Sequence, residues 1–257
     1  MFPSKFRICD VFGIPVYLDI SLIVLLVLFV MDFGSFTFGL ACALTLAVSI
    51  TLHELGHALT ARAFGYQTRD ITLSLLGGCA SLIGMPRKAS QEFLTALAGP
   101  LVSFALAGAG WAAVTFLPIE NVWLWNVLAY VFWMNLILGA FNLLPGFPMD
   151  GGRIFRSVAR IFTTRVKATY VAMVVGRVFA VLLALRGLHS IFTGGGWGVI
   201  SLLIAWMIWR EGWREYVMAV QEDRWGSPWE FSARVSPPPY SDDDDDDEVE
   251  VRKRRDD

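Results

Sequence analysis

The sequence predicts an all-α, polytopic membrane protein with about six transmembrane helices and a small β-sheet or hairpin on the cytoplasmic side. Hydrophobic residues make up 55% of the 257 residues and charged residues only 17%, whereas soluble domains carry about a quarter charged residues. The apolar residues gather in long runs, and a helix needs about 20 of them to cross a bilayer. Lys and Arg gather in alternate connections between these runs, as expected when a chain crosses a membrane repeatedly.

Six apolar segments are candidates for membrane spans. They cover residues 17–33, 36–64, 93–117, 122–142, 169–188 and 197–216. The first is short for a hydrocarbon core about 30 Å thick. The fifth contains Arg177, which is unusual for a helix that faces lipid. The first segment is not followed by a small-residue cleavage site, so we expect it to stay in the mature protein.

The charges of the connections predict the orientation. Positive residues precede the first segment and lie between the second and third and between the fourth and fifth: Lys5, Arg7, Arg62, Arg69, Arg87, Lys88, Arg153, Arg156, Arg160, Arg165 and Lys167. The other connections are nearly free of positive charge, with Arg186 as the exception. Because positive connections stay in the cytoplasm, both termini are expected there, and an even number of spans agrees with this.

Two stretches have the character of extended chain. Residues 6–17 contain Gly13 and Pro15 and lead into the first span. Residues 67–82 contain two β-prone runs on either side of Gly77-Gly78, which predicts a hairpin with its turn at these glycines. Both stretches lie on the cytoplasmic side, so they are expected to pair in one small sheet.

The composition changes near the C-terminus, which divides the chain into a membrane domain at residues 1–218 and a tail at 219–257. The tail contains three consecutive prolines, an acidic run at 242–248 and a basic cluster at 252–255. Such a segment cannot bury a core, so we predict a disordered cytoplasmic tail. Its Pro-Pro-Pro-Tyr string is similar to ligands of proline-binding domains, but short proline motifs are common by chance. The net charge of −2 gives no indication of a nucleic-acid partner.

The second span contains the string HELGH at residues 53–57. Positions i and i+4 share one face of a helix, so both imidazoles of His53 and His57 can reach one metal ion, with Glu54 beside it as a general base. The alternative is a pair of core histidines that hydrogen-bond to neighbouring helices. Ionisable groups inside a span cost at least about 2.5 kcal/mol each on insertion scales, which favours a functional polar site.

A catalytic zinc ion usually has three protein ligands, so a third is needed. The remaining histidine, His189, is expected at the opposite membrane face. Asp150 is the stronger candidate, because it follows the fourth span in NLLPGFPMDGG, where the prolines and glycines exclude a regular helix. Irregular backbone at membrane depth must be buried in protein or line a wet cavity. An ordinary cytoplasmic loop is the alternative. The second and fourth spans both end on the cytoplasmic side, so the two motifs can meet.

HELGH in an apolar helix, followed by NLLPGFPMDGG, is similar to the site-2 protease family of intramembrane zinc metalloproteases, peptidase family M50. The segments FGIPVYLDIS and LAGP also resemble the family, and the likeness covers residues 6–215. It implies one Zn²⁺ per chain, held by His53, His57 and Asp150, with Glu54 as catalytic base. Asn142 matches a family position thought to hold the substrate or the developing oxyanion.

The sequence departs from the family pattern at two positions. Met149 stands where Leu usually precedes Asp-Gly, and Ser103 stands where Asn is common. The second difference puts in question whether that position keeps a polar role.

The resemblance implies an intramembrane zinc metalloendopeptidase that hydrolyses membrane-spanning substrate proteins in regulated intramembrane proteolysis. The expected surroundings are the lipid bilayer of a prokaryotic cell membrane, and the extended segments would pair with an unwound substrate. The alternatives are a metal-binding transporter and an inactive protease homologue. A transporter gives no reason for a glutamate directly after the first ligand, and the sequence has no inverted repeat. The complete set of motif residues argues against an inactive homologue, and nothing in the sequence indicates an oligomeric state.

Overall fold

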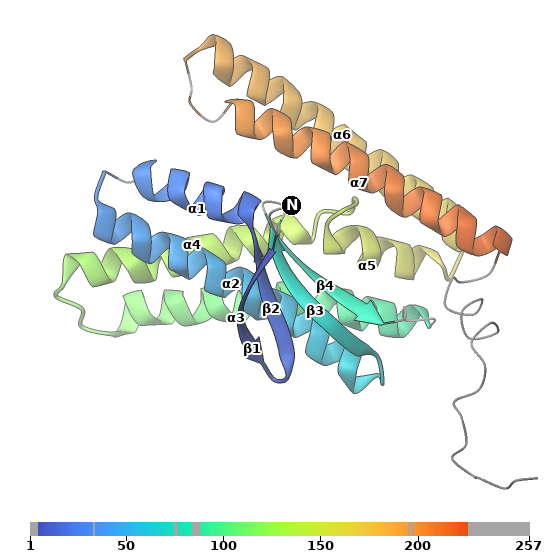
Figure 1. The fold of residues 1–257 in the computed structure, drawn as a ribbon, viewed down its shortest axis with the longest axis horizontal. Helices are drawn as coiled ribbons and strands as arrows, with labels where there is room; N and C mark the ends of the chain where they lie inside the picture. Colours follow the sequence, from blue (N-terminus) through green and yellow to red (C-terminus); the bar gives the residue numbers. More distant parts are fainter. Residues whose placement is uncertain are drawn as a thin grey trace, which may run out of the picture.

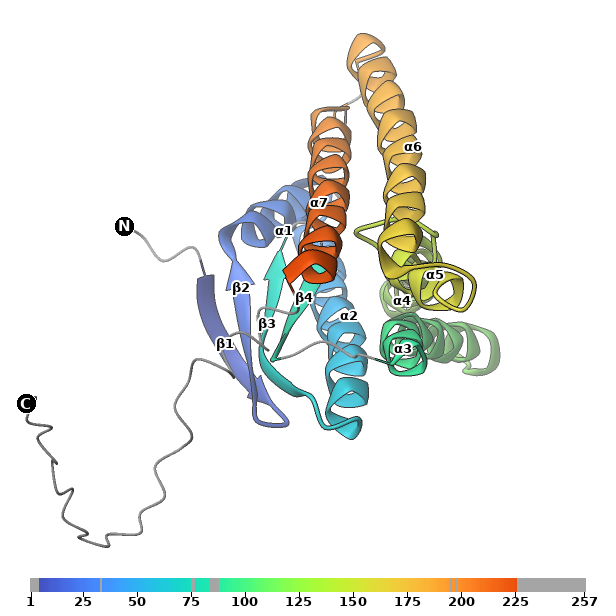
Figure 2. The same cartoon turned by 90° about the vertical axis from the view of Figure 1, so that its right-hand side faces the viewer.

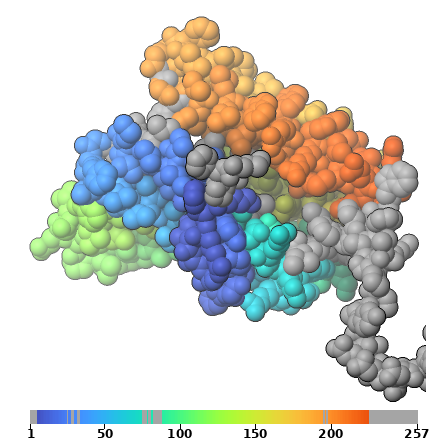
Figure 3. Space-filling model, viewed as in Figure 1, coloured from blue at the N-terminus to red at the C-terminus, as the bar shows by residue number. Residues whose placement is uncertain are grey.

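The structure is a computed structural model that describes residues 5–32, 34–74, 77–83, 88–194, 196 and 198–225. Its elements are β1 (Lys5–Val11), β2 (Ile14–Asp19), α1 (Ile20–Asp32), α2 (Phe36–Ala63), β3 (Gln67–Ser74), β4 (Gly77–Ile83), α3 (Ala89–Phe116), α4 (Val122–Asn142), α5 (Asp150–Ala159), α6 (Arg165–Phe192) and α7 (Gly198–Trp225). Helices α1–α4 and the sheet form one body, and the α6–α7 hairpin leaves it at an angle, with α5 between the two (Figure 1). In the space-filling view the hairpin projects from one flank of the molecule (Figure 3).

Four of the described helices, α2, α3, α4 and α6, are long and apolar enough to cross a membrane. Helix α2 has 28 residues and is therefore about 42 Å long at 1.5 Å per residue. Helix α1 has 13 residues, or about 20 Å, which is short for a span. Helix α7 also has 28 residues, but its second half carries many charges. The described helices thus give four candidate spans, and the number six stays a prediction.

The sheet has four strands in the order β1-β2-β3-β4. Strands β1 and β2 are antiparallel, β2 and β3 are parallel, and β3 and β4 are antiparallel. The two predicted extended stretches therefore do pair in one sheet. The predicted turn at Gly77-Gly78 is wrong, because both glycines lie in β4, where Gly78 pairs with Leu73. The connection between β3 and β4 at residues 75–76 lies outside the described residues.

The sheet packs on the second half of α2, the part that contains residues 53–57 (Figure 2). Apolar residues of the two central strands meet apolar residues of α2 in one buried cluster: Ile14, Val16, Ile71, Leu73, Ile50, Leu55 and Ala58. Burial of one such aliphatic side chain contributes about 1.5–3 kcal/mol. This packing fixes the sheet directly against the helix that carries the HELGH motif.

The chain leaves helical geometry between α4 and α5. Helix α4 ends at Asn142 and α5 begins at Asp150, so the chain between them, residues 143–149, is irregular, as predicted. The prediction that Gly151 and Gly152 also exclude a regular helix is wrong, because both lie in the first turn of α5. At the other end of the chain α7 continues to Trp225, past residue 218, where we expected the membrane domain to end. The predicted acidic and proline-rich parts of the tail lie outside the described residues.

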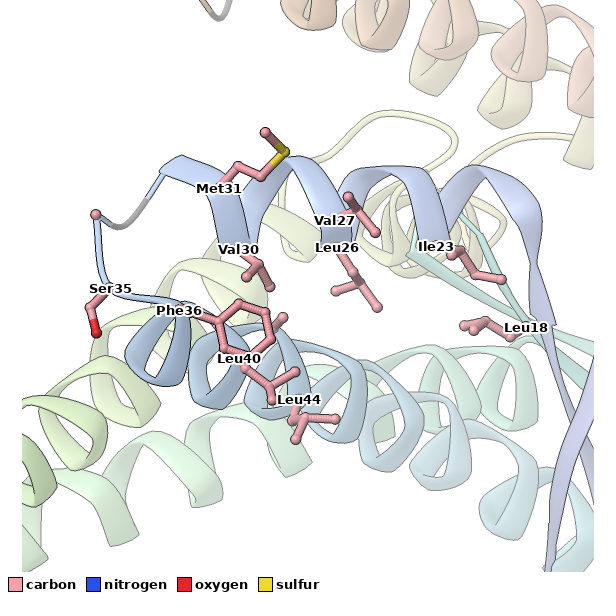
Figure 4. A pocket seen from close by; sticks show the side chains of 12 residues that line it. Leu18, Ile23, Leu26, Val27, Val30, Met31, Ser35, Phe36, Leu40 and Leu44 are labelled. Carbon is pink, nitrogen blue, oxygen red and sulfur yellow. The ribbon is translucent and has the colours of Figure 1, made fainter.

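An apolar groove of about 560 Å³ lies between α1 and α2 (Figure 4). Leu18, Ile23, Leu26, Val30, Leu40 and Leu44 are among its lining residues. None of the described residues that line it has an ionisable side chain. The groove therefore has no group for acid–base chemistry, and the group of His and Asp residues that could hold a metal ion lies elsewhere.

Candidate metal centre

The HELGH segment is buried within α2. His53, Glu54 and His57 are only 3%, 8% and 8% exposed. The spacing of four residues places both imidazoles on one face of the helix, as predicted, and their Nε2 atoms lie 3.2 Å apart. Two nitrogen donors therefore point to one place inside the protein.

Asp150 completes this group from a distant part of the chain. Its Oδ2 atom lies 3.0 Å from the Nε2 atom of His53 and 3.0 Å from that of His57. Burial of the Asp150 carboxyl raises its pKa, but the two imidazoles outweigh this effect, so the pKa lies below its ordinary value. An ionised carboxylate is the form that binds a metal ion. The structure thus brings together the three residues for which the sequence predicts a ligand role.

The three donor atoms fit a tetrahedral zinc site. Each residue offers one atom, all three atoms lie within 4.8 Å of one another, and no other such group of His, Cys, Asp and Glu occurs among the described residues. Zinc binds nitrogen and oxygen at about 2.0–2.1 Å in tetrahedral geometry, which places its ligand atoms about 3.3 Å apart. The observed separations of 3.0 to 3.2 Å need only a small outward movement to admit the ion.

The outer nitrogen of each imidazole has a partner that orients the ring. His57 donates its Nδ1 proton to the carbonyl oxygen of Thr95 at 2.7 Å, and His53 Nδ1 lies 2.9 Å from Ser103 Oγ. A carbonyl can only accept, so His57 carries a proton on Nδ1, and Nε2 is the ring nitrogen that faces the centre. Ser103 is fully buried, so the residue that replaces the family's usual Asn keeps a polar contact.

Two glycines bring backbone directly against the site. A Cβ atom on Gly99 of α3 would lie 2.2 Å from His57 Nε2, and one on Gly78 of β4 would lie 2.0 Å from Glu54 Cγ. Neither position can accept a side chain unless these functional groups move. Helix α3 and strand β4 therefore cover the metal-binding face of α2 closely, and β4 runs directly beside Glu54.

The remaining sequence candidates are placed differently. Asn142 is the last residue of α4, and its Nδ2 donates to the Leu138 carbonyl of its own helix at 3.0 Å. Its role toward substrate or oxyanion stays a prediction. His189 is exposed in the last turn of α6, at the end that lies away from α5 (Figure 1). It is not part of the donor group.

Comparison with known proteins agrees with this geometry. A profile of peptidase family M50 matches residues 41–122 and 118–185, which include all three donor residues. The chain belongs to peptidase family M50. It is 33% identical over 220 residues to a zinc metalloprotease of Methanocaldococcus jannaschii, a match that covers 85% of the chain and 60% of the relative.

A second relative and one solved structure extend this comparison. The M50 chain is 38% identical over 176 residues to Rip3 of Mycobacterium tuberculosis, covering 66% of the chain and 44% of Rip3. The structure of a site-2 protease from Methanocaldococcus jannaschii matches with a TM-score of 0.64 and 31% identity, covering 82% of this chain and 95% of that one. The chain spans 60% or less of the length of these two curated relatives.

Sequence reasoning missed several parts of the site. The Thr95 carbonyl is a backbone group, so its residue type carries no signal. The sequence pattern predicts a turn at Gly78, whereas the structure needs its small size beside Glu54. Ser103 stands out in the sequence only as a departure from the family pattern. Its spacing of four residues from Gly99, on the helix face that approaches the histidines, is the signal that could have identified it.

Proposed function

We propose that this chain is an intramembrane zinc metalloendopeptidase that hydrolyses peptide bonds of membrane-spanning proteins. The observation that carries the proposal is the convergence of His53, His57 and Asp150 beside a buried glutamate, within a body of helices apolar enough to span a bilayer. These three residues would hold one Zn²⁺ per chain. The metal and the activity named for the relative from Methanocaldococcus jannaschii are the same.

Each residue has a defined part in this chemistry. When bound, zinc supplies Lewis-acid polarisation and makes a water molecule acidic enough to lose a proton near pH 7. Glu54 would take that proton and return it to the leaving amine. Its position on α2, adjacent to His53 and enclosed by β4, keeps the carboxylate at the reaction site. Asn142 would hold the substrate carbonyl or its developing negative charge.

The sheet supports a route for substrate binding. A transmembrane helix hides its peptide bonds within its own hydrogen bonds, so a substrate must unwind locally. Strand β4 lies at the edge of the sheet, and edge strands can bind an extended peptide by strand addition. Because Gly78 of β4 lies against Glu54, a peptide added there would lie next to the general base. Cleavage of this kind would serve regulated intramembrane proteolysis.

The test uses Glu54→Gln in the full chain, purified in detergent and reconstituted with a single-span substrate. The variant should keep about one zinc ion per chain, because Glu54 is not a ligand. Cleavage should fall by about 10²–10⁴-fold, the usual contribution of a general base. Zinc content is measured by elemental analysis and cleavage by the appearance of product fragments.

Asp150→Asn and chelation are the controls. Asp150→Asn should lose zinc and activity together, and a chelator should abolish parental cleavage until zinc is restored. Cleavage by Glu54→Gln at the parental rate would refute the assigned role. A zinc-loaded parental chain that cleaves none of a panel of single-span proteins would favour an inactive homologue, and zinc uptake into vesicles would favour a transporter.

A further inference from the structure

A buried cluster of charged residues joins α3, α5 and α7 close to the metal centre. Its members are Glu92 of α3, Arg153 and Arg156 of α5, Arg160 directly after α5, and Glu215 of α7. Arg153 is the exposed edge of the cluster, with 42% of its side chain accessible. The Arg156 side chain is only 3% exposed, and those of Glu92 and Glu215 are 8% and 14% exposed. None of these residues has a part in the proposed reaction.

Arg156 is the centre of this cluster. Its Nε donates to Glu92 Oε1 at 2.7 Å, and its Nη1 donates to Glu215 Oε2 at 3.1 Å. Its guanidinium also lies over the Phe147 ring, 4.9 Å from the ring centroid. Arg160 donates to the other oxygen of Glu92 at 3.1 Å. One planar side chain thus contacts three separate parts of the chain in a single orientation.

The partners of Arg156 lie next to the groups that build the metal centre. Arg156 is on the same helix as Asp150, about 9 Å further along its axis. Glu92 lies one turn before Thr95, whose carbonyl orients His57. Phe147 is in the irregular segment that leads into Asp150. The cluster therefore connects the helix that carries one ligand to the helix that orients another.

Helix α5 needs such a connection. It has 10 residues, and helices shorter than about 12–15 residues are marginal without tertiary contacts. It also follows a segment that is not held by regular secondary structure. Burying charges costs free energy, so an apolar contact would serve simple attachment at least as well. What the guanidinium adds is a fixed direction of hydrogen bonding, which sets the position of α5.

We propose that Arg156, held by Glu92 and Glu215, is a positioning residue that keeps the Asp150 carboxylate within reach of His53 and His57. Because Glu215 belongs to α7, the affinity for the metal ion then depends on the position of the α6–α7 hairpin relative to α5. This inference rests on the proposed metal centre, but it concerns how the centre is held in place.

The experiment measures zinc affinity by chelator competition on the purified full chain. Glu215→Gln removes the charge of the more exposed carboxylate that pairs with Arg156. It should weaken zinc binding by about 10–100-fold, the usual effect of losing a residue that positions a metal ligand. Glu211→Gln is the matched control. It lies one turn earlier on α7, and the described ion pairs of Glu211 join it to Arg210 and Arg214 of the same helix. It should bind zinc within about 2-fold of the parental chain.

Arg156→Lys is the second variant, because it keeps the charge and loses the planar fork. It should also weaken zinc binding. Because each change leaves a buried charge with fewer partners, the zinc-free forms of Glu215→Gln and Arg156→Lys should also melt below the zinc-free parent, whereas Glu211→Gln should melt close to it. Zinc affinity of Glu215→Gln and Arg156→Lys equal to that of Glu211→Gln would overturn the inference. So would a loss of thermal stability in the zinc-free forms with unchanged zinc affinity. A parental chain that binds no zinc would instead refute the proposed function, and this inference with it.

Discussion

At the scale of single residues, the site depends on groups one layer behind the metal-binding atoms. Ser103 lies 2.9 Å from the outer nitrogen of His53. Ser103→Ala removes this contact, so the imidazole loses its orientation, and zinc affinity should fall by about 10–100-fold. Thermal stability should fall by only about 1 kcal/mol, the net value of a typical hydrogen bond. Chelator competition and thermal unfolding measure the two effects separately.

Thr95→Val is the control for Ser103→Ala. The Thr95 hydroxyl is buried and has no hydrogen-bond partner among the described residues, whereas its backbone carbonyl accepts from His57. Thr95→Val therefore removes a hydroxyl close to the site and keeps the ring contact, so zinc affinity should stay at the parental value. Equal affinities of the two variants would refute the orienting role of Ser103.

The two motifs show what single residues can predict. His53, Glu54 and His57 follow from helical spacing, and Asp150 follows from the need for a third ligand. The partners behind them could not be predicted so directly, because one is a backbone carbonyl and the other is brought in by helix packing. Gly78 shows a further limit of prediction from single residues. A glycine can be required because the backbone adopts an unusual conformation or because a neighbouring group approaches closely, and the residue type does not distinguish these two reasons.

At the scale of elements, the irregular segment before Asp150 is held by the α6–α7 hairpin. A Cβ atom on Gly176 of α6 would lie 2.4 Å from the Phe147 carbonyl oxygen. Gly176→Ala should therefore displace this segment and Asp150 with it. Overpacking of this kind costs about 1–3 kcal/mol, so thermal unfolding should occur at lower temperature and zinc should bind more weakly.

Gly212→Ala on α7 is the matched control for this contact. Its Cβ would meet Met173 Cγ at 3.6 Å and the Phe147 carbonyl oxygen at 3.7 Å, which are ordinary van der Waals distances. The same substitution against the same segment should then change stability and zinc affinity little. Equal effects of the two alanine variants would show that the close approach of α6 does not position Asp150.

The element boundaries follow the apolar runs where packing does not intervene. The predicted span 122–142 coincides with α4 (Val122–Asn142), and 36–64 differs from α2 by one residue. Helix α3 begins at Ala89, whereas the predicted span begins at residue 93. The prediction begins too late because it follows the apolar run, and the charged Glu92 in the first turn of α3 lies outside that run. In the fold, Glu92 pairs with Arg156, so its charge can be buried within the helix bundle.

At the scale of the whole molecule, positively charged residues are concentrated at one end of the helix bundle. The C-terminal ends of α1, α3 and α6 lie at one end of the molecule, and α5 and the C-terminal end of α7 lie at the other (Figure 1). The second end carries the arginines of α5 and the start of α6. Under the positive-inside rule, we predict that this end faces the cytoplasm. The charged residues in the second half of α7 lower the mean hydropathy of this helix, so α7 is not among the candidate spans. Whether α7 crosses the membrane must therefore be argued from its contacts.

Ion pairing between α6 and α7 gives an argument for that crossing. Glu222, near the end of α7, pairs with Arg165, the first residue of α6, at 2.8 Å. If α6 crosses the bilayer, α7 must return to the side on which α6 began. A single cysteine placed at position 223 of a cysteine-free chain should therefore react with an impermeant maleimide only after cells are permeabilised. A cysteine at position 120, between α3 and α4, should react in intact cells. Reaction at position 223 in intact cells would place the C-terminus outside and reduce α7 to a helix that does not cross.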